Sequence, residues 1–532
     1  MNRRHFLVSS AAAPLAAPLL AAPDARARLG LVRSTHTRLR QPAPLDDALT
    51  YDQVRDMVHS AIRYGAPQAG SLEKKIKPGA WVVIKPNIVF LRPHPSYAPG
   101  DITDFRVTRA VLEYVATHSK AARITIAEGG TYRNHKDKAE DNVVTQDGRR
   151  VNAYDFDWGP DEFPGFNGSV SSMLKELSRL HPSKRFDYVD LSYDAVRGPD
   201  GQFQRIVVPK SANGIGAFGG RADYFVTNTI TKCDFLISVP VMKVHLQCGI
   251  TASLKNYVGT APRQAYATPG VFHNANLHSQ HSAGDRIDPF IVDLAAFHPP
   301  DFCVVDGIRG LQTQEHSAHR ADQTVRSNLV FATEDPVAAD AMAARLLGFN
   351  PYDIEHLHLA SRRGMGTLEM SRIDYRGDEP DRSTRKWEKP RQWYGRCNRE
   401  WTLSTGNAPP RSYTAPYDTL DLPEATGASP SNAAVYRAAV NVQSQGHHRG
   451  YLWLGLRGRL TARVNGETVA TTESQTRYRT GQFQFPVSLR PGVNRIEFEV
   501  QPLSGQAKLS ALLTNSRNDG DTIEGIRWVK AR

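Results

Sequence analysis

The feature that most constrains the fold is an alternation of short apolar runs with amphipathic helical stretches between residues 45 and 378. Several apolar runs, among them 81–84, 235–239 and 302–305, do not alternate between polar and apolar residues. Such runs are typical of parallel strands that helices cover on both faces. We therefore predict an α/β domain over residues 45–378, built on a mostly parallel, doubly wound sheet.

Helix signals occur at regular intervals in this segment. Thr50 and Gln53 form a capping box ahead of apolar residues at helical spacing, and the helix should end at Gly65. Asp335 and Pro336 open a second amphipathic helix. Further strands are expected at residues 124–127, 188–191, 206–208 and 329–332.

From about residue 433 the apolar residues recur at every second position, which is typical of antiparallel strands. Asn465-Gly466 between two such runs favours a tight hairpin. We predict a small all-β sandwich, jelly-roll-like, over residues 433–532, joined to the α/β domain by an irregular connector over 379–432. Tyr451 and Trp453 could form a stacking platform for a glycan, with packing against the core or the other domain as the alternative.

The first residues carry an export signal. Arg3-Arg4 precede an apolar, Ala-rich run, and a small-x-small cleavage sequence ends at Ala27. Pro14 interrupts the run, which is shorter than the roughly 20 residues that a spanning helix needs. We predict a twin-arginine signal peptide over 1–27, a partnership with the twin-arginine translocase, and a periplasmic or secreted protein without a transmembrane anchor. Residues 28–44 are assigned to a linker, and a permanent membrane anchor is the alternative to the signal.

Composition narrows the classes of ligand. The formal net charge is +12, but the chain has no block of five or more Lys and Arg residues and no interleaved basic and aromatic stretch. We therefore expect no nucleic-acid partner, and the charge can instead aid solubility or attract small anions. Four cysteines without a C-x-x-C pair give no basis for an iron-sulphur cluster or a Cys-rich zinc site. Cys233 and Cys303 border apolar runs and are expected to be small buried hydrophobic residues.

Polar residues follow the predicted strands at the points where the strands end. Lys85 and Asn87 follow the first strand, and Glu128 follows the second. Lys243 with His245, Asp306 and Asp335 follow later strands. Because ligands of open parallel sheets bind outside the carboxyl ends of the strands, these residues predict a polar crevice of mixed charge.

The segment 240–260 is the richest in reactive side chains. Lys243 and Lys255 offer positive charges to a carboxylate or phosphate, and His245 can move protons near neutral pH. The stretch from Gly249 to Ser253 could present backbone N–H groups to an anion. A surface loop with solvated lysines is the alternative. No glycine pattern here matches a nucleotide-binding loop.

A histidine cluster lies downstream, where His273, His278, His281 and Asp285 occur together. Their spacing fits no standard zinc signature. We single out His278 and His281 as candidate ligands of a divalent metal, which Asp306 or His245 could complete. A polar loop with solvated or hydrogen-bonded histidines is the alternative.

Several motifs together resemble a known family. They are VVIKPNIV, TDFRVTRAVLEYV, CDFLISVPVMKVH, GITASLKNYVGT, VVDGIRGLQ and FATEDPVAADAMAARLLGFNP, and they lie in residues 80–375. This part of the chain is similar to the family catalogued as domain of unknown function 362, for which the resemblance implies no established reaction. Some relatives carry iron-sulphur modules, whose cysteines this chain lacks. The resemblance implies functional positions at Lys85, Asn87, Asp104, Lys243, His245, Lys255, Asn256, Asp306 and Asp335.

The C-terminal part resembles a second family. The runs VNGETVA and FPVSLRPGVNRIEFEV are similar to the galactose-binding-like domains appended to many exported bacterial enzymes. That fold has varied uses, so the resemblance adds no particular ligand.

Two functional hypotheses follow. In the first, the protein is an exported enzyme acting on a small anionic substrate, with Lys243, His245 and Asp306 as catalytic residues and metal dependence or redox chemistry left open. Substrate binding is assigned to Lys85, Asn87, Lys255 and Asn256. In the second, it is a non-catalytic periplasmic protein that binds a ligand or a glycan.

Overall fold

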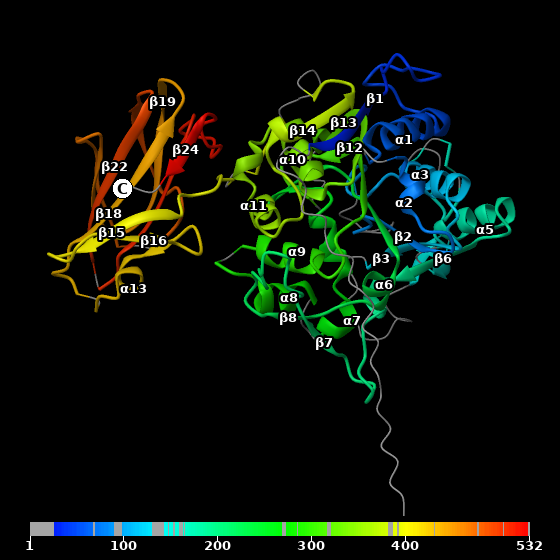
Figure 1. Cartoon of the computed structure of the whole chain (residues 1–532), viewed down its shortest axis with the longest axis horizontal. Helices are drawn as coiled ribbons and strands as arrows, with labels where there is room; N and C mark the ends of the chain where they lie inside the picture. The colour runs from blue at the N-terminus through cyan, green and yellow to red at the C-terminus, as the bar shows by residue number, and fades with distance from the viewer. Residues whose placement is uncertain are drawn as a thin grey trace, which may run out of the picture.

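The computed structural model describes residues 26–529 apart from several short segments. These are 68–69, 90–97, 130–142, 147, 153–154, 159–162, 164, 167, 269–272, 285, 316–320, 381–386, 391–392, 430, 476–477 and 504. The predicted signal peptide falls almost wholly outside the described residues, and Asp285 of the histidine cluster lies outside them too. Figure 1 shows an α/β part on the right and, on the left, the β part that follows it in sequence.

The α/β part is built on an eight-stranded sheet of order β14-β1-β13-β12-β9-β2-β3-β6. Only β13 runs antiparallel to its two neighbours, and the other five pairings are parallel. The strands span β14 Ile373–Gly377, β1 Ala27–Arg33, β13 Thr324–Thr333, β12 Phe302–Leu311, β9 Phe235–Val239, β2 Trp81–Pro86, β3 Arg123–Glu128 and β6 Arg185–Asp190. The prediction of a mostly parallel α/β sheet is confirmed.

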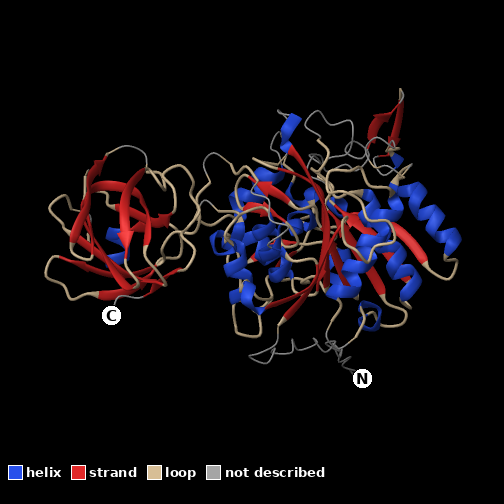
Figure 2. Cartoon of the chain, turned by 90° about the horizontal axis from the view of Figure 1, so that it is seen from above, coloured by secondary structure: helices blue, strands red, loops and turns tan. Residues whose placement is uncertain are grey.

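Helices cover both faces of this sheet (Figure 2). On β2, Val82 and Ile84 pack into the core beneath one set of helices, whereas Val83 packs into the core on the opposite face. The first set comprises α1 Tyr51–Gly65, α3 Phe105–His118 and α5 Val170–Leu180, and the second comprises α9 Asp288–Ala295, α10 Pro336–Leu346 and α11 Glu355–Arg362. Burial on both faces explains why the strand sequences lack alternation.

Helix α1 begins and ends where its sequence predicts. The Thr50 hydroxyl accepts a hydrogen bond from the Gln53 backbone N–H at 3.3 Å, and the Gln53 side chain accepts one from the Thr50 backbone N–H at 2.8 Å. The helix ends at Gly65, where an added Cβ would lie 2.0 Å from the Ala332 carbonyl oxygen on β13. A side chain at this position would therefore push α1 off the sheet.

Two parts of the domain assignment differ from the structure. The predicted linker 28–44 begins with β1, which lies inside the sheet between β13 and β14. The predicted strand 206–208 is β7 Arg205–Val207, which pairs with β8 Asp223–Phe225 in a separate hairpin. Strand β1 was missed because a polar stretch follows it, although Leu29, Leu31 and Val32 are fully buried.

The β part begins earlier than the predicted boundary at residue 433. The predicted connector contains β15 Glu400–Thr405 and β16 Arg411–Thr414, which pair into the same network as β18 Tyr436–Ser444. It also contains β17 Leu420–Asp421 and helix α13 Leu422–Thr426. The sequence of the connector does not show a strand pattern because its strands are short and separated by loops rich in Pro.

One long strand organises the β part. The first half of β19 His448–Val464 pairs with β21 Phe483–Leu489 and β23 Lys508–Thr514. Its second half pairs with β20 Glu467–Ser474 and β22 Gly492–Gln501, and β24 Ile526–Val529 pairs with β18. This antiparallel arrangement confirms a β domain after the α/β domain, whereas the jelly-roll topology stays a prediction. Asn465 and Gly466 have φ values of 52° and 90°, as the predicted hairpin turn requires.

Buried charges join the two parts. Asp418, from the β part, accepts hydrogen bonds from Arg286 Nε at 2.6 Å and from Arg399 Nη2 at 3.0 Å. Arg399 also pairs with Glu355 on α11, at 3.3 Å. Since all four side chains are largely excluded from water, each charge depends on its partners.

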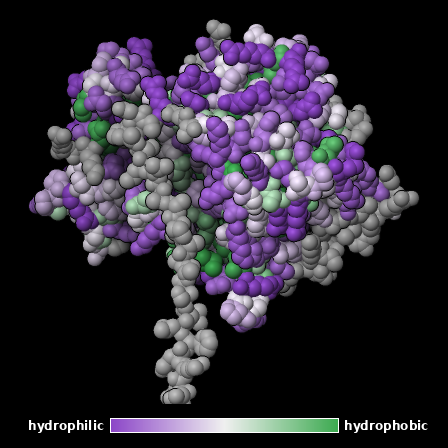
Figure 3. Space-filling view, turned by 45° about the vertical axis from the view of Figure 1, so that its right-hand side comes forward, coloured by the Kyte–Doolittle hydropathy of each residue, from purple (hydrophilic) through white to green (hydrophobic). Residues whose placement is uncertain are grey.

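None of the helices in the described part of the chain is both long enough and apolar enough to cross a bilayer. Hydrophilic residues predominate on the face shown in Figure 3. The exposed large hydrophobic side chains in the described residues come from separate elements: Leu180, Val207, Leu246, Tyr352, Tyr375, Tyr417 and Val493.

We predict that Asp418→Ala weakens the junction of the two parts strongly. The substitution leaves Arg286 and Arg399 buried without their shared carboxylate, which typically costs about 3–5 kcal/mol. Differential scanning calorimetry should show the first unfolding transition lowered by at least about 5 °C. Asp374→Ala, which removes an exposed ion pair with Arg376, is the matched control and should cost below about 1 kcal/mol. Equal effects of the two substitutions would contradict the prediction.

Candidate functional site

The chain after β9 folds back over the carboxyl ends of the parallel strands. It forms a hairpin of β10 Lys243–His245 and β11 Gly249–Thr251, followed by the short helix η3 Lys255–Thr260. Strand β12 continues well past the end of β9 and supports this segment, because Met242 N–H donates to the Asp306 carbonyl at 2.7 Å. The residues of segment 240–260 therefore lie at the edge of the sheet formed by the carboxyl ends of the parallel strands, and the crevice itself stays a prediction.

Lys85 and Asn256 fasten η3 to the sheet. The Lys85 ammonium lies 2.9 Å from Glu128 Oε2 and 3.0 Å from Asn256 Oδ1. Asn256 Nδ2 in turn donates to the Lys85 carbonyl at 2.9 Å and to the Ser238 hydroxyl at 3.1 Å. Burial lowers the pKa of Lys85, and the Glu128 carboxylate opposes that shift. The polar atoms of these predicted substrate-binding residues bind one another in this structure.

The backbone packs directly on this ion pair. A Cβ at Gly259 would lie 2.3 Å from Glu128 Oε1 and 2.7 Å from Lys85 Nζ. Only glycine leaves room for the pair beneath η3, so the position of the helix and the geometry of the pair depend on each other.

Lys243, predicted to be catalytic, forms a buried ion pair with Asp101. Its ammonium lies 2.5 Å from both the carbonyl oxygen and the Oδ1 of Asp101. The exposed fractions of the two side chains are 1% and 0%. Lys243 therefore links β10 to the loop that precedes α3.

Asp306, also predicted to be catalytic, lies within β12 and not at the end of a strand. Its Oδ2 accepts a hydrogen bond from Asp104 N–H at 2.8 Å, and its Oδ1 accepts one from Ile308 N–H at 2.9 Å. Burial, reinforced by the nearby Asp104 charge, raises the pKa of Asp306 to about 7. Asp104 itself caps α3 and pairs with Arg106. No hydrogen bond in the described structure joins Asp306 to His245, so Asp306 does not orient that imidazole as predicted.

Glu315 takes that place beside His245. Its Oε1 lies 3.1 Å from His245 Nε2, and its Oε2 accepts a hydrogen bond from Leu246 N–H at 2.6 Å. Gln247 N–H donates to His245 Nδ1 at 3.2 Å. Since Nδ1 accepts, the ring proton of the neutral imidazole belongs on Nε2, facing Glu315.

Lys255 is the cation of this site that lacks a carboxylate of its own. Burial lowers its pKa, and Cys248, Glu315, Lys243 and Arg263 act on it through their charges. Among the described residues, no side chain or backbone atom forms a hydrogen bond or ion pair with its ammonium. Lys255 therefore adds a partly buried positive charge that the other pairs do not neutralise.

The candidate metal ligands are on α8 His273–His281, and their rings pack against aromatic residues. His278 lies against Phe290 with 5.3 Å between ring centroids, and His281 stacks on Tyr224 at 3.8 Å. Burial lowers the pKa of His278 to about 4 and that of His281 to about 3. No group of three or more His, Cys, Asp or Glu side chains in the described residues could hold a metal ion. The predicted metal role of these histidines therefore has no geometric support here.

Of two other predicted positions, Asn87 lies near the other site residues, whereas Asp335 does not. Asn87 lies beside the crevice edge, and its side-chain oxygen is buried without a hydrogen-bond partner among the described residues. Asp335 caps α10 by accepting from Ala338 N–H at 2.8 Å. Because β13 runs antiparallel to β12, the chain at Asp335 is heading away from the crevice edge, and grouping it with the other strand ends was wrong.

A buried charge network supports the loop between β11 and η3. Asp340 on α10 accepts hydrogen bonds from the backbone N–H groups of Ser253 and Leu254 at 2.6 and 3.0 Å. His356 lies between Asp340 and Asp288, at 3.6 and 3.0 Å. Burial alone would lower the pKa of His356, but the two carboxylates raise it to about 9.

Sequence reasoning missed three charged residues of this region, which are Asp101, Arg263 and Glu315. It placed Glu128 at the end of a buried strand but gave it no role of its own. Asp101 and Glu315 lie in loops far from their partners in sequence. Nothing in their local sequence predicts those contacts.

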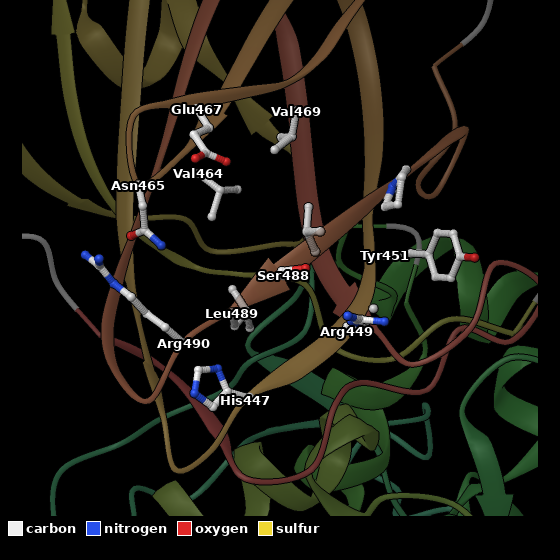
Figure 4. A pocket seen from close by; sticks show the side chains of 13 residues that line it. His447, Arg449, Tyr451, Val464, Asn465, Glu467, Val469, Ser488, Leu489 and Arg490 are labelled. Atoms are coloured by element: carbon white, nitrogen blue, oxygen red, sulfur yellow. The ribbon is translucent and has the colours of Figure 1, made fainter.

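The β part contains a separate pocket of about 700 Å³. Figure 4 shows Arg490 and Asn465 on one side of it and Tyr451 and Arg449 on the other. Trp453 does not share this pocket. It is 8% exposed, packs with Cys397 and Leu512, and donates from Nε1 to the Ser516 carbonyl at 3.0 Å. Of the two residues proposed as a stacking platform, only Tyr451 lines a pocket.

Comparison with protein families gives one match. A family described as "Domain of unknown function (DUF362)" matches residues 208–345. The matched segment contains β9, β10, β11, η3 and β12, and therefore Lys243, His245, Lys255, Asn256 and Asp306. None of the curated proteins matches the chain.

Comparison with solved structures gives remote likenesses. The lactate racemase apoprotein from Thermoanaerobacterium thermosaccharolyticum shares 12% identity at a TM-score of 0.27, with 58% of this chain and 54% of that one covered. The chain thus spans about half the length of that racemase. A family 35 carbohydrate binding module from an environmental isolate has 16% identity, a TM-score of 0.16 and coverages of 20% and 78%. A PA14 sugar-binding domain from an RTX adhesin has 22% identity, a TM-score of 0.13 and coverages of 15% and 45%. TM-scores this low carry no argument about ligand or activity.

We predict that Asp306 makes the α/β domain less stable as the pH rises through neutrality. Its pKa is raised in the folded state, so its contribution favours folding at low pH and is lost as the pH rises through about 7. Between about pH 5 and pH 8, the unfolding free energy of the wild type should fall by about 1 kcal/mol or more relative to Asp306→Asn. Denaturant melts at several pH values would measure this, with the partly exposed Asp374→Asn as control. Parallel curves for wild type and Asp306→Asn would contradict it.

Proposed function

We propose that the α/β domain is an enzyme domain that binds a small anionic substrate at Lys255, with His245 as the proton carrier beside it. The observation that carries this proposal is the ammonium of Lys255, which is partly buried and has no ion-pair partner among the described residues. Lys85, Lys243 and His245 each have a carboxylate partner nearby. An uncompensated cation shielded from water is costly, and a bound anion would offset that cost.

The roles of the remaining residues follow from their contacts. Lys85 and Asn256 hold η3, and thereby Lys255, at a fixed place over the sheet. Lys243 holds the other end of the hairpin through Asp101. We assign these residues to positioning and keep the chemical role for His245, whose Nε2 faces Glu315 at 3.1 Å.

We predict that Lys255→Met weakens anion binding by at least about tenfold, because a hydrogen bond to a charged group contributes about 1.5–3 kcal/mol. Isothermal titration of the purified full chain with acetate, glycolate, oxalate and inorganic phosphate would measure it. Lys232→Met is the matched control, because Lys232 is an exposed lysine on another helix that contacts Asn228. Unchanged binding in Lys255→Met would overturn the proposal.

The same ligands distinguish an enzyme from a binding protein. Incubation of the bound acid in D₂O, followed by NMR, detects proton exchange at the carbon next to the carboxylate. Exchange that the wild type catalyses and His245→Gln loses would support the enzyme. Lys255-dependent binding without exchange or turnover would favour the alternative, a non-catalytic ligand-binding protein.

We propose a second function for the β part, the binding of a glycan. Its support is the pocket of about 700 Å³, which Arg449, Arg490 and Glu467 line. Tyr451 also borders it, but its ring points away from the other labelled side chains (Figure 4) and packs with Trp453, Cys397 and Leu512. The charged side chains offer hydrogen bonds to hydroxyl or carboxylate groups.

We predict that an acidic polysaccharide retards the protein through this pocket. Affinity gel electrophoresis in alginate should slow the wild type, and Arg449→Ala and Arg490→Ala should each lose most of that retardation. Arg437→Ala removes an exposed arginine that pairs with Glu499 outside the pocket, so it should behave like the wild type. Equal mobility of all four proteins would exclude this function, and dextran in place of alginate tests whether charge matters.

Export by the twin-arginine route and a periplasmic or secreted location complete the proposal. Their support is the sequence of residues 1–27. Cell fractionation of the wild type and of a variant with Arg3→Lys and Arg4→Lys tests them, since cytoplasmic retention is expected only for the variant.

A further inference from the structure

The side chain of Glu315 is bound as a small carboxylate ligand would be. One oxygen faces His245 Nε2 at 3.1 Å, and the other accepts from Leu246 N–H at 2.6 Å. Its charge also acts on Lys255, the cation that the proposed function assigns to the substrate. The site therefore presents one backbone hydrogen-bond donor, one imidazole nitrogen and a positive charge to one planar carboxylate.

We infer that Glu315 occupies the binding place of a substrate carboxylate, and that a free carboxylate ligand binds by displacing it. This inference rests on the proposed function and adds two points to it. It names the chemical class of the substrate, a carboxylate, and it makes Glu315 an internal competitor that must leave before the ligand binds.

Burial and contacts distinguish Glu315 from the other carboxylates near these cations. The exposed fraction of its side chain is 12%, compared with 0% for Asp101 and 4% for Glu128. Glu128 accepts hydrogen bonds from Ile88 N–H and Gly129 N–H in addition to its ion pair with Lys85, so it cannot leave without exposing several buried donors. The Glu315 side chain gives up two contacts on leaving, and both donors could pass to the ligand.

The Leu246 N–H belongs to an exposed turn, whereas the His245 side chain is 6% exposed. Leu246 is 50% exposed at the turn between β10 and β11. The backbone of this turn is held by the hairpin, in which Val244 pairs with Ile250 and His245 with Gly249. The donors therefore keep their positions when Glu315 moves away, and the vacated place is preorganised for a second carboxylate.

Charge conservation gives this exchange a measurable consequence. When one carboxylate replaces another, the site keeps its charge, but the ligand must compete with an internal group of high local concentration. Removal of the Glu315 charge should remove the competitor. Free carboxylates should then bind at least about tenfold more tightly, since Glu315 no longer competes for the Leu246 N–H and the His245 imidazole.

The experiment compares Glu315→Gln and Glu315→Ala with the wild type in the full chain. Isothermal titration with acetate, glycolate, oxalate and inorganic phosphate gives the affinities. Glu334→Gln is the matched control, because it changes the net charge equally in a surface residue that pairs with Lys75. The inference expects tighter carboxylate binding in both Glu315 variants and unchanged binding in Glu334→Gln.

A second measurement does not depend on affinity. In the ¹⁵N-leucine-labelled wild type, the amide resonance of Leu246, assigned through Leu246→Ile, should shift on titration with the tightest carboxylate and saturate at its dissociation constant. Carboxylate binding without a shift at Leu246 would overturn the inference.

The outcomes separate the two proposals. If the wild type binds a carboxylate in a Lys255-dependent manner but both Glu315 variants bind it no better, the displacement is wrong and the proposed function stands. If phosphate gains affinity and the carboxylates do not, the carboxylate class is wrong. If neither the wild type nor any variant binds an anion, the proposed function fails, and this inference fails with it.

Discussion

The candidate site depends on the ion pair between Lys85 and Glu128 at the carboxyl ends of β2 and β3. Both side chains are buried, so the pair is stable only while Asn256, the Pro86 carbonyl and nearby backbone N–H groups satisfy its remaining hydrogen bonds. That requirement draws η3 onto the sheet and leaves glycine as the fitting residue at 259. The position of Lys255, the first residue of η3, is a consequence of this buried pair.

The burial of each carboxylate partner also determines which charged residues hold the structure and which could bind a ligand. Lys85 and Lys243 have buried carboxylate partners, so their ion pairs hold the structure in place. His245 pairs with the more accessible Glu315, whereas Lys255 has no ion-pair partner among the described residues. A buried charge without a replaceable partner can hold a loop, but it cannot also receive a substrate without breaking that loop.

The sequence predicted the sheet well because burial on both faces leaves a direct trace in its strands, as at 81–84 and 235–239. It predicted the site less well where strand direction matters. Asp335 ends a strand as expected, but β13 is antiparallel, and the carboxyl ends of opposed strands do not share an edge. Strand β1 was not predicted because polar residues follow it. Glu315 was not predicted because its partner, the backbone N–H of Leu246, is distant in sequence.

Glu315 also bears on the choice between positioning and chemistry for His245. The hydrogen bond from Gln247 N–H to Nδ1 leaves the proton on Nε2, so the imidazole acts first as a donor. A ligand carboxylate in the place of Glu315 would meet the same ring nitrogen. In the proposed exchange, a proton leaves Nε2 only if the ligand also presents a more basic atom to it. We therefore propose a substrate that combines a carboxylate with a second, adjacent group able to accept a proton.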